Sequence, residues 1–288
     1  MDIPGDKPLF DSLSKEIHSA NLFEREMKEM FGIEAIGSPD SRRLKLHDEV
    51  WGPDGAYPLR KDFTGKAIDA KENKRYEFKK VEGEGVFEVP VGPVHAGIIG
   101  PGHFRFSAAG EPIINLEMRL GFTHRGVEKL FEGKSPEYAM DIAECVSGDS
   151  AFSHSLAFSM AVEKICNIKI SRNFQYLRAA LLELERMYNH VNDVGGMALD
   201  VGFTYSSAYA SLVKESLLAL NKRLTGHRYL KGINAIGGLK KRFTKNERLV
   251  LNDSLKPILS DFQSLKKMLL SSISFMDRVD SAGILRKK

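Results

Sequence analysis

The clearest hydrophobic pattern lies in the second half of the chain, where apolar residues recur at steps of three and four. This spacing places them on one face of a helix that packs against a core. The predicted helices cover residues 150–167, 172 to about 195, 207–224, and 244 onward. The second is the most regular, with a core-facing stripe formed by Leu177, Leu181, Leu184, Tyr188 and Val191. The pattern therefore predicts a helical bundle.

Helix-breaking and capping residues set the expected limits of these helices. Gly195 and Gly196 are expected to end or bend the second helix. Thr244 and Glu247 have the spacing of a capping box, which predicts the start of the last helix. Pro257 lies within that last helix and is expected to kink or divide it.

The first half of the chain has a different pattern. Residues 8–31 are amphipathic and stop at Gly32, which predicts a helix. Residues 37–63 are rich in Pro, Gly and charge and predict an extended arm that packs over another element. From residue 86 to 118, short apolar runs separated by Gly and Pro predict antiparallel strands. The expected fold class is α+β, with a mainly α-helical bundle core and a small N-terminal antiparallel β region.

A Gly, Ser and Asp loop before Ala151 leads directly into the first predicted helix of the bundle. Asp149 or Ser150 can cap that helix, because a side-chain oxygen there accepts a hydrogen bond from an amide of the first turn. The unpaired amides of a helix N-terminus can also receive an anion, a developing negative charge or a ligand carbonyl. The loop therefore predicts either a binding site or a plainly capped core helix.

Composition narrows the class of protein. The 288 residues are 42% hydrophobic and 28% charged, which is typical of a folded globular domain. The sequence shows neither a membrane-spanning apolar run nor a signal peptide, so a cytoplasmic protein is expected. Its two cysteines, Cys145 and Cys166, predict reduced thiols rather than a disulfide framework or a self-contained metal site. The net charge of +4 is not accompanied by a recognition motif, so no nucleic acid partner is expected.

Histidines mark two candidate sites. His95 and His103 bracket a glycine-rich bend over residues 97–102, where the backbone can approach a ligand closely. His190 lies on the charged face of the most regular helix, which is either a site or a solvated surface. The residues alone leave both alternatives open.

Several longer motifs occur in an order that resembles a known family. Residues 21–63, with FEREMKEMFGI, PDSRRL and PLRKDF, resemble the C-terminal part of the C subunit of respiratory NADH:quinone oxidoreductase, complex I. Residues 86–285, with VGPVHAG, GHFRF, THRGVEK, AFSHSLAFSMAVEK, LLELERMYNH and MALDVG, resemble its D subunit. The same modules are fused in the large subunit of membrane-bound [NiFe] hydrogenases of the formate hydrogenlyase type. The resemblance implies the fold shared by these subunits.

This resemblance also implies how the chain is divided. Residues 1–65 correspond to the C-subunit-like helix and extended arm, and residues 66–85 to a linker. Residues 86–288 correspond to a D-subunit-like domain that is expected to be incomplete at its C-terminus.

Metal chemistry separates the two related groups. A [NiFe] hydrogenase binds its metals with two Cys-x-x-Cys pairs, because thiolates suit soft metal centres. The first pair falls on Ser147 and Ser150, and Cys145 is out of register. No metal ligands and no nickel are therefore expected.

The complex I relatives instead imply a quinone site. His103 matches a histidine that can donate to a quinone carbonyl, and Asp200 matches its acidic partner, so these two are the candidate catalytic residues. Gly148 falls where the family has a headgroup-binding tyrosine, and this departure puts ordinary ubiquinone binding in question. His95 lies in the same loop as His103 and is a further candidate for cofactor binding.

Two other positions match residues that face a [4Fe-4S] cluster held by a neighbouring subunit. They are Arg125 of THRG and His190 of YNH. A positive charge or an imidazole near a cluster raises its reduction potential.

The resemblance implies a subunit of an NAD(P)H:quinone oxidoreductase-type complex, active only within that complex. It implies a small iron–sulfur subunit and membrane-arm subunits as partners, and a peripheral position on the cytoplasmic face of the cell membrane. An alternative is a hydrogenase-like large subunit without a [NiFe] site, which acts as a structural or coupling element. A third is a non-catalytic fragment whose missing helices leave part of its core uncovered.

Overall fold

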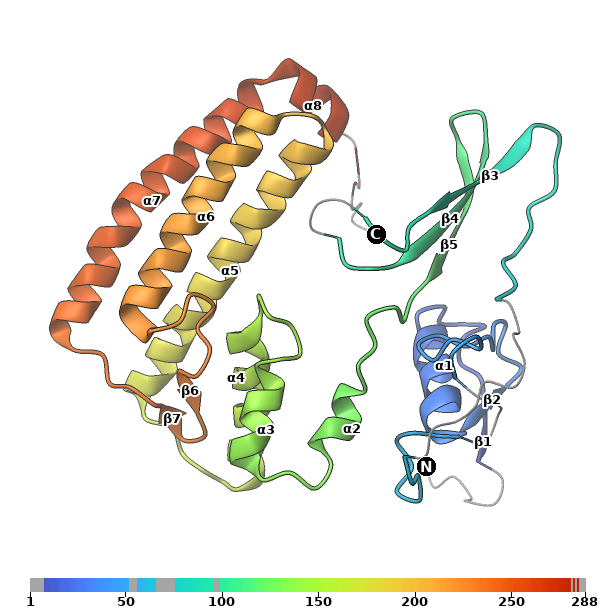
Figure 1. Cartoon of the computed structure of the whole chain (residues 1–288), viewed down its shortest axis with the longest axis horizontal. Helices are drawn as coiled ribbons and strands as arrows, with labels where there is room; N and C mark the ends of the chain where they lie inside the picture. The colour runs from blue at the N-terminus through green and yellow to red at the C-terminus, as the bar shows by residue number, and fades with distance from the viewer. Residues whose placement is uncertain are drawn as a thin grey trace. The chain divides into compact units, whose positions relative to one another are not determined.

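The computed structural model describes residues 8–51, 56–65, 76–95, 99–280, 282 and 284 (Figure 1). Contacts divide the chain into two compact units, Met1–Glu132 and Gly133–Lys288. The first unit combines strands with short helices, and the second is mainly helical, which confirms the predicted α+β class. The domain limits at residues 65 and 85 stay predictions, and residues 66–75 of that linker lie outside the described residues.

The first unit begins with β1 (Leu9–Asp11), α1 (Ala20–Phe31) and β2 (Glu34–Ile36), in which β1 and β2 pair in parallel. The prediction that the helix starts at residue 8 was therefore wrong. The carboxylate of Glu24 explains the difference, because it accepts hydrogen bonds from Ser12 Oγ at 2.8 Å and the amide of Leu13 at 2.7 Å. These bonds hold the preceding residues in a turn. Gly32 ends α1 in the left-handed conformation, as predicted.

The extended arm is held on α1 by hydrogen bonds to its backbone, and it also buries Leu44 and Leu46. Arg25 of α1 donates to the carbonyl oxygens of Arg42 and Arg43, each at 2.7 Å. Glu29 of α1 accepts from the amides of Lys45 and Leu46. The arm residues 37–51 contain no helix or strand, so these side chains satisfy backbone groups that would otherwise lack partners. The predicted arm that packs over another element is confirmed.

Three antiparallel strands follow, as predicted. They are β3 (Val86–Val91), β4 (His103–Ala109) and β5 (Ile113–Arg119), in the order β3-β4-β5 (Figure 1). Gly110 has a φ of 67° in the turn between β4 and β5, a conformation that favours glycine. A short helix, α2 (Val127–Phe131), completes the first unit.

The two faces of this sheet differ in chemistry. One face is apolar, and its members are Phe87, Val89 and Val91 of β3, Phe104, Phe106 and Ala108 of β4, and Ile114, Leu116 and Met118 of β5. Leu116 and Met118 are 46% and 51% exposed. The other face carries His103, Arg105, Glu117 and Arg119, and the chain's own residues 76–79 bind to it. Within this unit, the polar face is therefore the one that a connecting segment covers.

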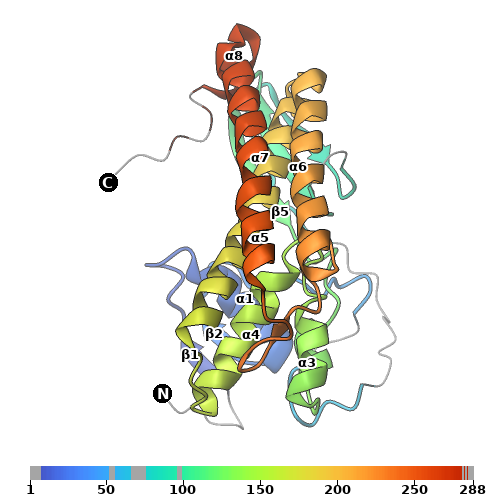
Figure 2. The ribbon, with the colours of Figure 1, turned by 90° about the vertical axis from the view of Figure 1, so that its left-hand side faces the viewer.

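The second unit is built on three long helices. They are α5 (Arg172–Asp200), α6 (Thr204–Thr225) and α7 (Lys245–Ser271), and α6 packs against both others (Figure 2). Around them lie the elements α3 (Pro136–Ala143), α4 (Ala151–Ile165), β6 (Asn234–Ala235), β7 (Gly238–Leu239) and α8 (Ile273–Val279). Leu181, Leu184, Tyr188 and Val191 are buried in the core, which confirms most of the predicted stripe. Leu177 is partly buried against it.

Two helices continue past residues that were expected to end or bend one of them and to kink or divide the other. α5 continues through Gly195 and Gly196 to Asp200. A Cβ atom at Gly195 would lie 3.0 Å from Cβ of Ala210 on α6, so this glycine allows the two helices to approach closely. α7 continues past Pro257, and the predicted capping box of Thr244 and Glu247 opens it. None of the described helices has the combination of length and hydropathy that a membrane span requires.

Candidate functional site

The loop between β3 and β4 holds His95 and His103 at its two ends. His95 Nε2 lies 2.6 Å from the carbonyl oxygen of Gly102, so the ring ties the two ends of the loop together. Gly92 has a φ of 84°, and a Cβ atom there would lie 2.2 Å from that same carbonyl oxygen. The close approach therefore requires glycine. His95 is engaged within the loop, and its predicted role in cofactor binding stays a prediction.

His103 has one engaged and one unengaged ring nitrogen. Its Nδ1 lies 3.3 Å from the carbonyl oxygen of Gly92. Its Nε2 is buried and has no hydrogen-bond partner in the described part of the chain. The ring lies against Phe78, with a centroid separation of 5.2 Å. A buried polar atom without a hydrogen-bond partner is uncommon in a folded protein, so this nitrogen is the feature of the loop that calls for an explanation.

Asp200 is the last residue of α5 and is exposed. A carboxylate at the C-terminal end of a helix is opposed by the helix dipole, so local stability does not account for its presence. His103 belongs to the first unit and Asp200 to the second. The predicted pairing of these two residues therefore stays a prediction.

Arg125 and His190 also belong to different units. Arg125 is exposed in the turn that precedes α2. His190 is exposed on α5 and lines a pocket of about 260 Å³, together with Met187, Val191, Val213, Leu217, Ile258, Leu259 and Phe262. Because its other lining residues are apolar, an imidazole is the one titratable group of this pocket. That both residues face one cluster stays a prediction.

The N-terminus of α4 is occupied by a carboxylate of the protein itself. Glu185 of α5 accepts hydrogen bonds from the amides of Phe152 at 2.8 Å and Ser153 at 3.0 Å. Ser150 is the N-cap residue, but its side chain makes no capping hydrogen bond. The helix end is thus a capped core element, and the alternative of an open anion site at these amides is not supported.

The loop before α4 is also held by α5. Tyr188 Oη and Asn189 Nδ2 donate to the carbonyl oxygen of Asp149, at 2.6 and 3.1 Å. Ser147 Oγ donates to the carboxylate of Asp149 at 2.6 Å. Gly148 is exposed, and a Cβ atom there would meet nothing within 4 Å. Neither space nor backbone conformation prevents a larger residue at this position.

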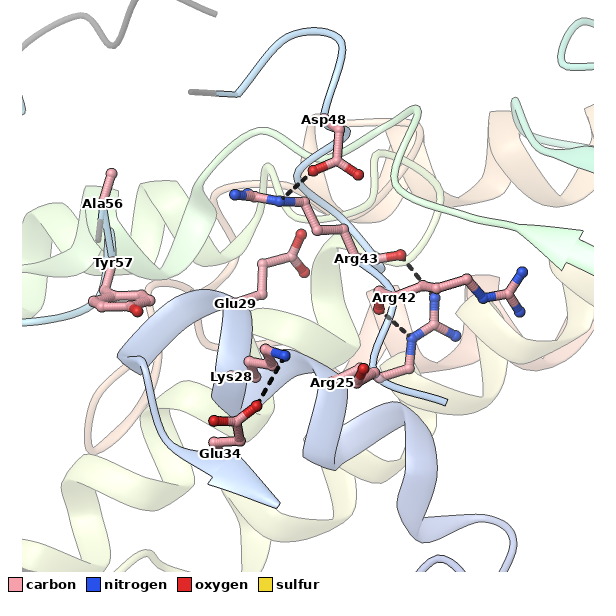
Figure 3. A pocket seen from close by; sticks show the side chains of 10 residues that line it. Arg25, Lys28, Glu29, Glu34, Arg42, Arg43, Asp48, Ala56 and Tyr57 are labelled. Carbon is pink, nitrogen blue, oxygen red and sulfur yellow. Dashed lines mark hydrogen bonds and ion pairs between the residues drawn. The ribbon is translucent and has the colours of Figure 1, made fainter. Parts of the chain in front are cut away.

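A charged pocket of about 440 Å³ lies between α1 and the arm (Figure 3). Its ionic groups are paired with each other, for example Lys28 with Glu34 at 3.2 Å and Arg43 with Asp48 at 2.7 Å. It contains none of the residues predicted to form the site. These pairs hold the arm on α1, so we assign the charged residues of this pocket a structural role.

Sequence reasoning missed three residues that shape the candidate site. They are Phe78, which lies against His103, Glu117, which anchors residues 76–79, and Glu185, which caps α4. Each makes its contact with a residue far away along the chain, so no local pattern identifies it. In the described ranges, no cluster of three or more His, Cys, Asp or Glu side chains could hold a metal ion.

Comparison with known proteins adds the family context of these residues. Residues 1–69 match the family described as the 30 kDa subunit of respiratory-chain NADH dehydrogenase. The chain is 32% identical over 290 residues to formate hydrogenlyase subunit 5 of Escherichia coli, covering 99% of the chain and 51% of that relative. It is 26% identical over 304 residues to the C/D subunit of NADH-quinone oxidoreductase from Phocaeicola vulgatus, covering 98% of the chain and 57% of the relative. The chain is related to both kinds of subunit.

This relationship confirms the resemblance carried by the motifs of residues 21–63 and 86–285. The chain spans about half the length of the curated relatives that it matches. One solved structure, of the membrane-bound sulfane sulfur reductase, an archaeal respiratory membrane complex, superimposes with a TM-score of 0.64 at 20% identity. It covers 70% of this chain and 54% of that chain, and it supports the fold.

Proposed function

We propose that the chain is a subunit of a membrane-associated oxidoreductase related to complex I, and that it passes electrons from a partner's [4Fe-4S] cluster to a quinone-like acceptor. The relatives are subunits of NADH-quinone oxidoreductase, formate hydrogenlyase and hydrogenase-4, which supports membership of such a complex. The proposal of a quinone-like acceptor rests on the buried Nε2 of His103, which has no hydrogen-bond partner among the described residues. A quinone carbonyl can accept a hydrogen bond from this nitrogen when the ring is charged. Leaving a buried polar atom unsatisfied costs about 1–3 kcal/mol.

His103 and Asp200 have complementary roles in this proposal. When bound, a quinone supplies an acceptor of electrons and protons. The imidazolium form of His103 donates a proton toward the acceptor from Nε2. Asp200 is the acidic partner of His103 in this proposal, and its negative charge favours the protonated form of the ring. This chemistry belongs to an NAD(P)H:quinone oxidoreductase-type complex, and the chain supplies only the residues at its acceptor end.

The remaining candidate residues, Arg125 and His190, concern the partner subunits of the proposed complex. Arg125 and His190 face the cluster, which requires a small iron–sulfur subunit beside this chain. Membrane-arm subunits anchor the complex in this proposal, in keeping with relatives such as the membrane-bound hydrogenase subunit alpha of Pyrococcus furiosus. The chain itself lies peripherally on the cytoplasmic face of the membrane.

Replacement of His103 tests the acceptor role directly. In the purified native complex, His103→Ala is expected to lower the rate of quinone reduction by about 100-fold, because a positioned general acid contributes on the order of 10²–10⁴. Steady-state kinetics with a soluble quinone measures this effect. His18→Ala changes an exposed histidine in a turn of the same unit and is expected to leave the rate unchanged. Full activity of His103→Ala would show that the assigned role is wrong.

Gly148 offers a test of acceptor specificity. Gly148→Tyr introduces the residue that the complex I relatives carry, at a position with free space and an ordinary backbone conformation. We expect its hydroxyl to lower the KM for a ubiquinone analogue about tenfold, the effect of one added hydrogen bond. Gly148→Phe is the matched control, since it adds the ring without the hydroxyl. Equal KM values for the two variants would contradict the prediction.

The second candidate function is that of a hydrogenase-like large subunit without a [NiFe] site, acting as a structural or coupling element. It is favoured by Ser147, whose hydroxyl donates to Asp149 at the position where the hydrogenases have a thiolate ligand. The 32% and 31% identities to formate hydrogenlyase subunit 5 and hydrogenase-4 component G of Escherichia coli also favour it. Unchanged quinone reduction in His103→Ala, with iron but no nickel in the complex, would select this alternative. Stoichiometric nickel would contradict both candidates.

A further inference from the structure

Residues 76–79 bind to the polar face of the β3-β4-β5 sheet and bring an aromatic ring against His103. The rings of Phe78 and His103 have centroids 5.2 Å apart and are inclined at 54°. The guanidinium of Arg105 lies 4.1 Å from the centroid of the Phe78 ring. Phe78 thus contacts both residues, which point from the same face of β4.

This segment is held in place by one carboxylate. Glu117 of β5 is 8% exposed and accepts from the amide of Lys79 at 2.8 Å and from Tyr76 Oη at 3.1 Å. It also pairs with Arg42, whose guanidinium donates to the carbonyl oxygen of Glu77 at 2.7 Å. Buried hydrogen bonds to a charged acceptor are the stronger class, so this anchor fixes the backbone on both sides of Phe78.

His103 needs such support because its own polar contacts do not fix the ring. Its hydrogen bond to Gly92, at 3.3 Å, is long, and its other ring nitrogen has no partner in the described ranges. The ring turns about its Cα–Cβ and Cβ–Cγ bonds, and one long hydrogen bond restricts that rotation only weakly. The ring of Phe78 prevents this rotation by packing.

We propose that Phe78 is a positioning residue that fixes the orientation of the His103 ring, and that Glu117 acts on the same ring through residues 76–79. This inference rests on the proposed function, in which His103 donates to the acceptor. Donation requires the nitrogen to lie within hydrogen-bond reach of the acceptor, and a displacement of about 1 Å in such a group lowers a rate on the order of 100-fold. Both residues act on the acceptor only through the His103 ring.

The first measurement uses the ring itself and does not depend on turnover. In the full chain labelled with ¹³C and ¹⁵N at histidine, the ring resonances of His103, assigned by their loss in His103→Ala, are expected to move in Phe78→Leu. The same shift is expected in Glu117→Ala, whereas Phe78→Tyr retains the wild-type resonances. Phe87→Leu makes the same change on the apolar face of the sheet and is expected to leave the His103 resonances in place.

The second measurement is the kinetics of quinone reduction by the intact complex. Phe78→Leu is expected to lower kcat about 10- to 100-fold with a smaller change in KM, and Phe78→Tyr to restore kcat to within about twofold. Phe78→Leu combined with Glu117→Ala is expected to be no worse than the more damaging single variant, because both act through one contact. This lack of additivity would support the proposal.

The two measurements separate the inference from the proposed function. Unchanged His103 resonances in Phe78→Leu would overturn the positioning role, whatever the activity. Altered resonances with full activity in Phe78→Leu, while His103→Ala is inactive, would also overturn it. Altered resonances with full activity in both variants would support Phe78 as the residue that fixes the ring and would overturn the role of His103 in quinone reduction.

Discussion

Replacing Arg178 by alanine is expected to lower the free energy of unfolding of the second unit by about 3–5 kcal/mol, because it leaves a buried carboxylate without its partner. Arg178 and Glu163 form an ion pair with separations of 2.6 and 2.9 Å, and both side chains are 6% exposed. Arg178 also donates to the carbonyl oxygen of Ala235 at 2.7 Å, so it joins α4 and α5 to the β6-β7 hairpin. Urea unfolding of the full chain, followed by far-ultraviolet circular dichroism, measures the loss.

The matched control is a second arginine on the same helix. Arg186 pairs with Glu183 at 3.3 Å, but these side chains are 54% and 58% exposed. Arg186→Ala is expected to leave stability nearly unchanged, since exposed pairs are weak. Similar losses for the two variants would show that burial is not the cause. In the double variant Glu163→Gln with Arg178→Met, part of the stability should return, because no buried charge is left unpaired.

The same ion pair makes stability depend on pH. Burial opposes the ionisation of Glu163, but hydrogen bonds from Arg178 and from the amide of Gly237 outweigh it and hold its pKa below the ordinary value. A carboxyl with a lowered folded-state pKa stabilises the fold above its unfolded pKa. That contribution is lost as the pH falls through the folded-state pKa, so the Arg178→Ala difference should shrink at acidic pH.

Glu185→Ala is expected to lower the free energy of unfolding of the same unit by about 2–4 kcal/mol. The change removes the acceptor of two amides at the N-terminus of α4, one of which belongs to Phe152, a residue that is 0% exposed. A buried amide without a partner costs about 1–3 kcal/mol, more where the lost acceptor is charged. Native-state hydrogen exchange is the most direct measurement, because the amides of Phe152 and Ser153 should exchange faster than the rest of α4.

Glu183→Ala is the control for this prediction, since Glu183 lies two positions earlier on α5 and is exposed. It should leave both amides protected. Glu185→Gln keeps one carbonyl acceptor, so its exchange rates at the amides of Phe152 and Ser153 should lie between those of the wild type and of Glu185→Ala. If the exchange of both amides were unchanged in Glu185→Ala, the cap would not be the source of its stability.

The helical half of the fold follows from the sequence because its signals are local. The stripe from Leu181 to Val191 repeats with the period of a helix, and each of its members is buried or packed against the core. The capping box at Thr244 involves residues three positions apart, and it too was predicted correctly. Such features need no knowledge of distant residues.

Long-range contacts account for what the pattern could not predict. Residues 12–14 read as helical, but Glu24 binds them in a turn before α1 begins. Gly195 was expected to end or bend α5, but the helix continues through it and this glycine allows the close contact with Ala210 on α6. Glu185 has no local signal that marks its role, because it binds amides 33 and 32 positions earlier. In each case the partner, rather than the local sequence, sets the structure.

The candidate site was accessible to sequence reasoning only through the family. The motifs identified His103 and Asp200, but their residue types alone did not distinguish a site from an ordinary loop or helix end. Phe78 lies 25 positions before His103, in a stretch whose composition predicted only a linker. Its contact with His103 depends on the pairing of β4 with β5, which places Glu117 and His103 on one face of the sheet.

The contact of His103 with the carbonyl oxygen of Gly92 determines which ring nitrogen can exchange a proton. A carbonyl only accepts hydrogen bonds, so Nδ1, 3.3 Å away, carries a hydrogen in both charge states of the ring. Neutral His103 can then only accept at Nε2, and only the charged ring donates there. The ring therefore gains and loses its proton at the same nitrogen, Nε2. It cannot pass a proton from one ring nitrogen to the other. If His103 is the proton donor of the proposed function, it is therefore protonated again from the side of the ring on which it donates.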